Sequence, residues 1–172
     1  ALVALDLTPA QMTAELGIDM VSFGGTKNGC WCAEALVFLR PEMADQTPFL
    51  RKRAAHLFSK SRFIAAQFDA YFEDGRWLDI ARHANAMSAR LQTGINSSSN
   101  ARLAWQSPAN ETFPIVSKAL SKQLTDKGAM FYEWTAPRST AHLVGPDETM
   151  LRLVTSFATT PDHVDQFIGM LG

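Results

Sequence analysis

The feature that most constrains the fold is a short glycine-rich loop between two apolar, strand-like runs. Residues 18–23 form the first run, Gly24 and Gly25 end it, and residues 34–39 form the second run. Apolar runs of this length, bounded by turn residues, are typical of buried strands. We therefore expect Lys27 to lie on a tight loop between two buried strands, where the glycines let a ligand approach the backbone.

A lysine in this loop has two explanations. It is either the solvated tip of an ordinary strand connection, since most lysines lie on solvated surfaces, or a reactive amine. In the second case, partial desolvation lowers the pKa of the amine and frees it to form a Schiff base with an aldehyde cofactor. The spacing around Lys27, taken alone, favours the solvated tip, because short motifs often match by chance.

Periodicity along the rest of the chain predicts further helices and strands. Thr8 and Gln11 form a capping box, which predicts a short helix ending at Leu16. An amphipathic helix is expected over residues 77–91, with Gly94 marking its end. Other helices are expected over residues 48–70 and 118–127 and from residue 160 onward, and strands over residues 112–116, 130–134 and 149–157. The C-terminal part therefore reads as an antiparallel sheet with helices on one face.

Composition narrows the range of partners. The net charge of -1 gives no basis for expecting nucleic acid or an anionic membrane as a partner. No apolar run approaches the ~20 residues of a membrane helix. Cys30 and Cys32 lie one residue apart on an expected strand and so point to opposite faces, which disfavours a disulfide. We expect two buried thiols in a reducing compartment and no metal site.

Four blocks of sequence, taken in order, carry a family resemblance. They are DMVSFGGTKNG at residues 19–29, SKSRF at 59–63, WLDIARHANAM at 77–87 and LRLVT at 151–155. Together they resemble the low-specificity L-threonine aldolases, a family that includes phenylserine aldolases. These are pyridoxal-phosphate enzymes of the aspartate-aminotransferase fold type, known as fold type I. The resemblance extends over nearly the whole chain.

The resemblance implies an α/β fold, the C-terminal part of a fold type I enzyme. Residues 1–65 are expected to be the end of the large cofactor-binding domain with the interdomain helix. Residues 66–172 are expected to form the small α+β domain with its antiparallel sheet. The resembling enzymes are longer and carry their cofactor lysine past the middle, so we expect this chain to be their C-terminal half. Much of the cofactor site lies upstream of the lysine in that family, which implies an incomplete active site here.

The resemblance also assigns roles to particular residues. Lys27 matches the catalytic Schiff-base lysine for pyridoxal 5'-phosphate, and Thr26 and Arg62 match positions close to that cofactor. Arg152 matches an arginine that binds the substrate α-carboxylate. Strand alternation places Arg152 on the face opposite its two leucine neighbours, and its planar fork suits a carboxylate. The pattern alone favours a solvent-side strand arginine, and the resemblance reverses that preference.

The activity implied by the resemblance is the cleavage of L-threonine, or of a related β-hydroxy-α-amino acid such as phenylserine, to glycine and an aldehyde. This would make the protein a carbon–carbon lyase, expected to be a cytoplasmic homo-oligomer, either a dimer or a tetramer. Two alternatives stay open. One is another pyridoxal-phosphate lyase or transaminase of the same fold, and the other is a cofactor-free interaction or assembly domain derived from it.

Overall fold

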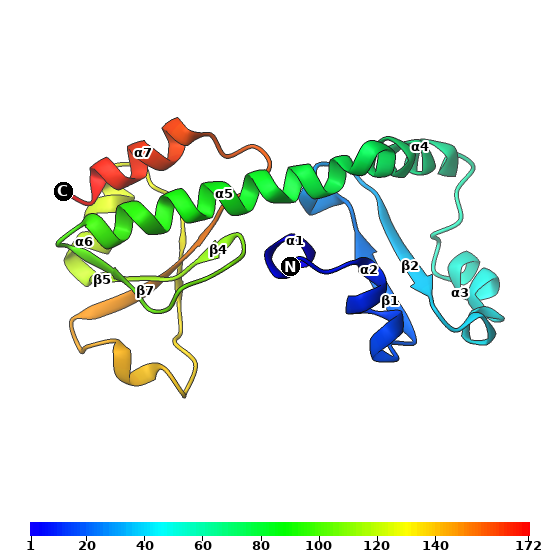
Figure 1. Ribbon diagram of the computed structural model, residues 1–172, viewed down its shortest axis with the longest axis horizontal. Helices are drawn as coiled ribbons and strands as arrows, with labels where there is room; N and C mark the ends of the chain where they lie inside the picture. Colours follow the sequence, from blue (N-terminus) through cyan, green and yellow to red (C-terminus); the bar gives the residue numbers. More distant parts are fainter. The chain divides into compact units, whose positions relative to one another are not determined.

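The computed structural model describes residues 1–172 and divides into two compact units, Ala1–Ala81 and Arg82–Gly172 (Figure 1). The boundary falls inside the long helix α5 (Arg76–Ser97), so this helix belongs to both units. The domain boundary expected after residue 65 stays a prediction. Every helix falls short of the combination of length and apolar character that a membrane-crossing helix needs.

A two-stranded antiparallel sheet is the centre of the Ala1–Ala81 unit. Strand β1 (Met20–Gly24) pairs with β2 (Glu34–Phe38) in a register that runs from Met20 opposite Phe38 to Gly24 opposite Glu34. Two short helices, α1 (Leu2–Leu5) and α2 (Pro9–Met12), precede it. The capping box predicted at the start of α2 is confirmed, and a 3-10 turn, η1 (Ala14–Leu16), then leads toward β1.

The expectation that both strands are buried is wrong in this chain. The side chains of Met20, Leu36 and Val37 are 44%, 57% and 40% exposed. Only one face of β1 is covered, chiefly by aromatic side chains of the helices that follow, whereas an apolar run of this kind needs cover on both faces. Both cysteines are free thiols, but the expectation that they are buried is wrong, because Cys32 is exposed and Cys30 is only half-buried, and both precede β2.

The helix expected over residues 48–70 is broken into two. Helix α3 (Thr47–Arg53) ends in a turn where Ala55 adopts a left-handed conformation with φ of 58°, and the His56 amide donates to the Arg51 carbonyl. This hydrogen bond across the turn satisfies a terminal carbonyl and stops the helix. Helix α4 (Ser61–Phe72) begins after a non-helical segment and ends in the 3-10 turn η4 (Glu73–Gly75). Between β2 and α3 lies another 3-10 turn, η3 (Pro41–Ala44).

Helix α5 continues past Gly94, so the expectation that this glycine ends the helix is wrong. A Cβ atom at Gly94 would lie 2.1 Å from Cδ1 of Ile168 on helix α7 (Pro161–Met170). The missing side chain therefore allows α7 to pack directly on the α5 backbone. Here tertiary packing, rather than helix termination, explains the glycine.

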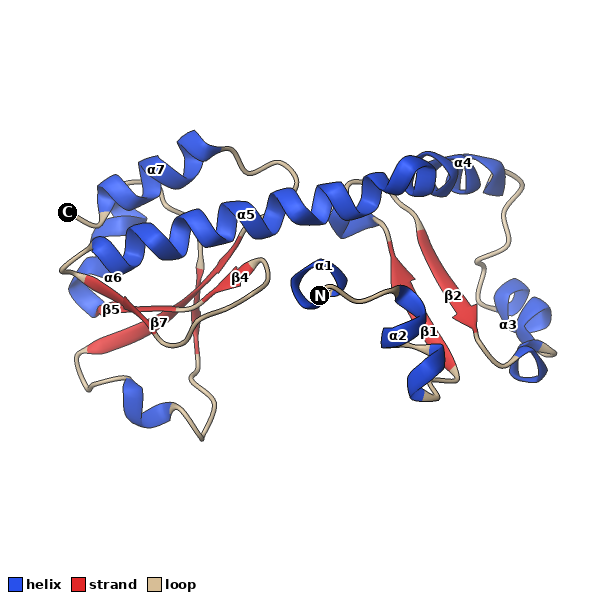
Figure 2. Cartoon of the chain, viewed as in Figure 1, coloured by secondary structure: helices blue, strands red, loops and turns tan.

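An antiparallel sheet with helices on one face forms the Arg82–Gly172 unit (Figure 2). The central strand β7 (Glu148–Val154) pairs with β5 (Pro114–Ser117) and with β6 (Tyr132–Trp134). It also pairs with β4 (Glu111–Thr112), while β3 (Ala101–Leu103) pairs with the outer edge of β5. The expected strand 112–116 is thus interrupted at Phe113, in keeping with the proline at position 114.

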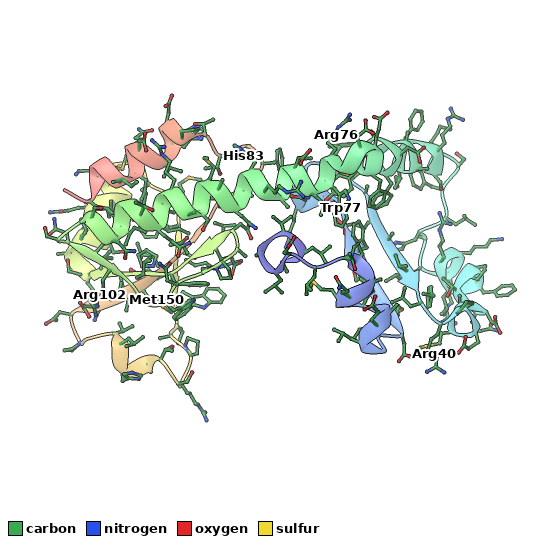
Figure 3. All side chains as sticks on the ribbon, viewed as in Figure 1. Arg40, Arg76, Trp77, His83, Arg102 and Met150 are labelled. Atoms are coloured by element: carbon green, nitrogen blue, oxygen red, sulfur yellow. The ribbon has the colours of Figure 1, made fainter.

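The core of this unit lies between the sheet and helices α5, α6 (Lys118–Asp126) and α7. Its fully buried members include Ile95, Leu124 and Leu151. A second apolar cluster, made of Phe113, Ile115 and Met150, packs on the opposite face of the sheet (Met150 is labelled in Figure 3). The arrangement matches the small α+β unit expected from the sequence.

Candidate active site

The Lys27 loop is a single 3-10 turn, η2 (Thr26–Asn28), between β1 and β2. The Gly25 carbonyl accepts the backbone amides of Asn28 and Cys30, each at 3.0 Å, and the Gly25 amide donates to the Ala33 carbonyl at 2.7 Å. Gly29 closes the turn with φ of 112°, a conformation that residues with a Cβ rarely adopt. The loop is therefore tightly closed, as its sequence predicts.

Lys27 and Thr26 both lie on the exposed side of this turn. The amine of Lys27 makes no hydrogen bond and no ion pair with the rest of the chain. Its neighbour Asn28 turns the other way and donates hydrogen bonds to Tyr71 and to the Trp77 carbonyl. The loop thus exposes the Lys27 amine without a bonding partner, while its other side is hydrogen-bonded to Tyr71 and to the Trp77 carbonyl through Asn28.

Arg62 lies in the first turn of α4, in the same unit as Lys27, and its side chain is exposed. The guanidinium carbon lies 4.9 Å from the ring centre of Phe63. This contact is a cation–π interaction on an exposed surface, worth about 0.5–1 kcal/mol. The anionic neighbour expected for Arg62 is not provided by this chain, so its role near a cofactor stays a prediction.

Arg152 lies on β7 in the other unit, on the face opposite Leu151 and Leu153, which are 0% and 8% exposed. Its side chain is half-buried and already paired. The Nε atom donates to Oε1 of Glu111 at 3.1 Å, and Nη2 donates to the same oxygen. The guanidinium carbon also lies 5.1 Å from the ring centre of Trp134. The arginine is therefore clamped between a carboxylate and an aromatic ring.

Sequence reasoning missed Asn28, Tyr71, Glu111 and Trp134. Glu111 reaches Arg152 across the β4–β7 pairing, and Trp134 reaches it from β6, where Tyr132 lies directly opposite Arg152. These partners are set by strand register, which the sequence of β7 does not contain. An asparagine in a turn commonly has a hydrogen-bonding side chain, but the partners of Asn28 lie 43 and 49 residues later in the chain, and no local pattern specifies them.

Buried hydroxyl groups join β4 and the residue that follows β7 to helix α5. The Thr155 hydroxyl donates to the Ala84 carbonyl at 2.7 Å, and the hydroxyls of Ser88 and Thr112 lie 2.9 Å apart. All of these side chains are buried and satisfied. Because buried hydrogen bonds of this kind fix a strand against its helix, the position of Arg152 is well determined within its unit.

Comparison with known proteins identifies relatives of the chain. No protein-family model matches it. A low-specificity L-threonine aldolase of a Pseudomonas species is 37% identical over 128 residues, which cover 74% of this chain and 37% of that relative. The same enzyme of Pseudomonas aeruginosa is 33% identical over 128 residues, with the same coverage. The chain thus spans 37% of the length of these curated relatives.

Solved structures share the fold of the chain. The threonine aldolase of Leishmania major aligns with a TM-score of 0.78 and 27% identity, covering 90% of this chain and 42% of that chain. The serine palmitoyltransferase of Sphingomonas wittichii aligns with a TM-score of 0.62 and 17% identity, covering 92% and 40%. The fold is therefore that of the C-terminal part of a fold type I enzyme, as expected.

Within that class, the sequence relationship places the chain with the low-specificity L-threonine aldolases.

Proposed function

We propose that the protein containing this chain is a pyridoxal-phosphate-dependent aldolase. It cleaves L-threonine, or a related β-hydroxy-α-amino acid such as phenylserine, to glycine and an aldehyde. The observation that carries this proposal is the uncommitted, exposed amine of Lys27 on a closed loop, in a chain related to threonine aldolases. We further propose a homo-oligomer, a dimer or tetramer, in the cytoplasm.

The residues present fit a pyridoxal 5'-phosphate group in their chemistry. Lys27 offers a primary amine with no competing partner, and Thr26 offers a hydroxyl on the same exposed side of the turn. Arg62 offers a guanidinium with no anionic partner in this chain. An aldehyde needs the first of these groups and a phosphate needs the other two, so the donor set suits the cofactor.

Each residue then has a defined task. Lys27 would hold the cofactor covalently through Nζ, while Thr26 and Arg62 would donate hydrogen bonds to it. When bound, the cofactor supplies an electron sink for the bonds of the substrate α-carbon. In the net reaction the Cα–Cβ bond breaks, the β-hydroxyl loses its proton, and the α-carbon gains one.

Arg152 would bind and orient the substrate α-carboxylate through its planar fork. Glu111 occupies Nε and Nη2 of that fork, which leaves Nη1 without a protein partner. A substrate carboxylate must therefore share or displace Glu111. Trp134 keeps the guanidinium in place during this exchange through its ring contact.

The test uses the protein expressed from its own gene, incubated with pyridoxal 5'-phosphate and then reduced with borohydride. We expect the cofactor label on the peptide that contains Lys27, and glycine and acetaldehyde as the products from L-threonine. Lys27→Ala should abolish both the label and the turnover, whereas Lys52→Ala, at an exposed lysine of α3, should preserve them. Label on another lysine, or full turnover by Lys27→Ala, would refute the assignment.

Two measurements separate the alternatives. An alanine product in place of glycine and aldehyde would favour another reaction on the same fold. A protein that takes up no cofactor would favour an assembly domain. Sedimentation of the same protein tests the proposed oligomer, since apolar side chains such as Phe49, which is 71% exposed, would be covered in an assembly. A strict monomer would contradict that part of the proposal.

A further inference from the structure

We propose that Asn28 is the positioning residue for Lys27, because its amide fastens the Lys27 loop to the junction between helices α4 and α5. This inference rests on the proposed role of Lys27 and adds a residue that sequence reasoning did not single out. The Asn28 Nδ2 atom donates to the Tyr71 hydroxyl at 2.5 Å and to the Trp77 carbonyl at 3.0 Å. Both hydrogens of the amide are therefore used.

The orientation of the Asn28 amide follows from its partners. The Trp77 carbonyl is only an acceptor, so the amide must present its NH₂ group there rather than its oxygen. The Tyr71 hydroxyl, which can both donate and accept, then accepts the second hydrogen. Replacing the NH₂ group with any acceptor would place two acceptors against each other at Trp77.

The anchor that holds Asn28 is rigid. Tyr71 is 5% exposed and belongs to an aromatic cluster made of Phe23, Phe68, Tyr71, Phe72 and Trp77. Figure 3 labels Trp77 at the start of α5, and its ring centre lies 5.9 Å from that of Phe23 on β1. Close packing limits the rotamers of Tyr71, and the Trp77 carbonyl belongs to the backbone of α5, so both acceptors of Asn28 are held in place.

A fixed Asn28 determines the direction of Lys27 because the two residues are consecutive in one 3-10 turn. Such a turn has three residues, so neighbouring side chains leave it in clearly different directions. With Asn28 directed into the aromatic cluster, Lys27 is directed outward. The Gly25 hydrogen bonds close the base of the loop, but they do not connect it to the helices.

A second hydrogen bond ties the segment after the loop to α4, and it supplies a matched control. The Cys32 amide donates to Oε1 of Gln67 at 3.0 Å. This bond is similar in kind to those of Asn28 but lies five residues past Lys27 in the chain. Removing the Gln67 side chain should loosen that segment without redirecting Lys27.

The Tyr71 phenol provides a spectroscopic readout of the anchor. Burial raises the pKa of Tyr71, the hydrogen bond from Asn28 opposes that rise, and Cys30 adds to it. Loss of the Asn28 amide should therefore raise the pKa of Tyr71 further. The chain has two tyrosines, and Tyr132 is 73% exposed, so a Tyr132→Phe background isolates the Tyr71 titration.

The experiment compares Asn28→Ala, Tyr71→Phe and Gln67→Ala in the protein loaded with pyridoxal 5'-phosphate. Asn28→Ala should lower kcat for L-threonine by about tenfold or more with little change in KM, because misdirecting a reacting group costs rate rather than binding. Tyr71→Phe removes one acceptor and should have a smaller effect in the same direction. Gln67→Ala should leave kcat unchanged.

Two further measurements do not depend on catalysis. In Asn28→Ala, the Tyr71 phenol should titrate at higher pH, and backbone amides 26–29 should exchange with solvent faster than in Gln67→Ala. An unshifted phenol or unchanged amide exchange would show that the anchor does not exist. A shifted phenol with unchanged kcat would show that the anchor does not position Lys27, and either result overturns the proposal.

Failure of the proposed function is recognised separately. If the unmodified protein neither labels Lys27 nor produces glycine from L-threonine, the aldolase assignment fails. The phenol titration and amide exchange then decide alone whether Asn28 fixes the loop. Circular dichroism shows whether Asn28→Ala folds. If it does not, Tyr71→Phe, which deletes only one oxygen atom, tests the anchor through kcat and through the amide exchange of residues 26–29.

Discussion

Replacing Gly94 with alanine should destabilise the chain, although alanine is the better helix former. Gly94 lies in the last turn of α5 (Arg76–Ser97), where helix propensity alone would favour alanine by up to about 1 kcal/mol. Opposing this gain, an added Cβ would lie 2.1 Å from Cδ1, 2.5 Å from Cγ1 and 3.1 Å from Cγ2 of Ile168. The outcome depends on whether Ile168 can move away.

Ile168 has little freedom to do so. Rotation about χ2 could remove Cδ1, but Cγ1 and Cγ2 are both attached to the branched Cβ, and helices strongly restrict χ1 of isoleucine. Relief therefore requires α7 to shift away from α5. Overpacking of this kind costs about 1–3 kcal/mol, and three close contacts suggest the upper part of that range. After the propensity gain is subtracted, Gly94→Ala should lower the free energy of unfolding by about 1–2 kcal/mol.

The assay is urea unfolding of the 172-residue chain followed by circular dichroism, with midpoints compared at equal slope. Gly169→Ala is the matched control, because no atom lies within 4 Å of a Cβ at that position of α7. It should be neutral or slightly stabilising. In an Ile168→Ala background, Gly94→Ala should become stabilising, because only the propensity gain remains. Destabilisation of the same size with and without Ile168 would refute the explanation by packing.

Two further outcomes are expected in the Arg82–Gly172 unit. Glu111→Gln should lower KM for L-threonine, because a neutral amide competes less strongly than a carboxylate for Arg152; a raised KM would mean that Glu111 supports binding. Arg102 and the Gly145 amide lower the pKa of Glu148 from 4.5 to about 2. The resulting stability is therefore present above pH 4.5 and lost as the pH falls toward about 2. Arg102→Ala should flatten the acid limb of a urea-midpoint profile over that range, and an unchanged limb would contradict the assignment.

The face on which Arg152 lies could be predicted from sequence, whereas its partners could not. Alternation with Leu151 and Leu153 places it on one side of β7, since both leucines must reach the core. Glu111, however, lies 41 residues earlier and meets Arg152 through the pairing of β4 with β7. Trp134 reaches Arg152 through the pairing of β6 with β7. Strand register is a tertiary property, and no local pattern in β7 specifies it.

Two errors about helices have the same origin. Gly94 carries the ordinary signal of a helix end, but the approach of Ile168 gives it another use. Alanine is not a typical helix-ending residue, yet Ala55 adopts a left-handed conformation where α3 ends. That conformation is unfavourable for a residue with a Cβ. In both cases a contact distant in sequence or a strained turn overrides local propensity, which is a weak preference for any single residue.

Strands β1 and β2 are less buried than their apolar runs predict, whereas the core face of β7 is buried, and the number of neighbouring layers accounts for the difference. Strand β7 has strands on both edges, helices on one face and an apolar cluster on the other. Strand β1 has one paired edge and one covered face. A continuous apolar run indicates that both faces of a strand pack against other structure, but it does not indicate which elements those are. In this chain, which spans 37% of the length of its curated relatives, the side chains of Met20, Leu36 and Val37 therefore lack part of the cover that their apolar runs predict.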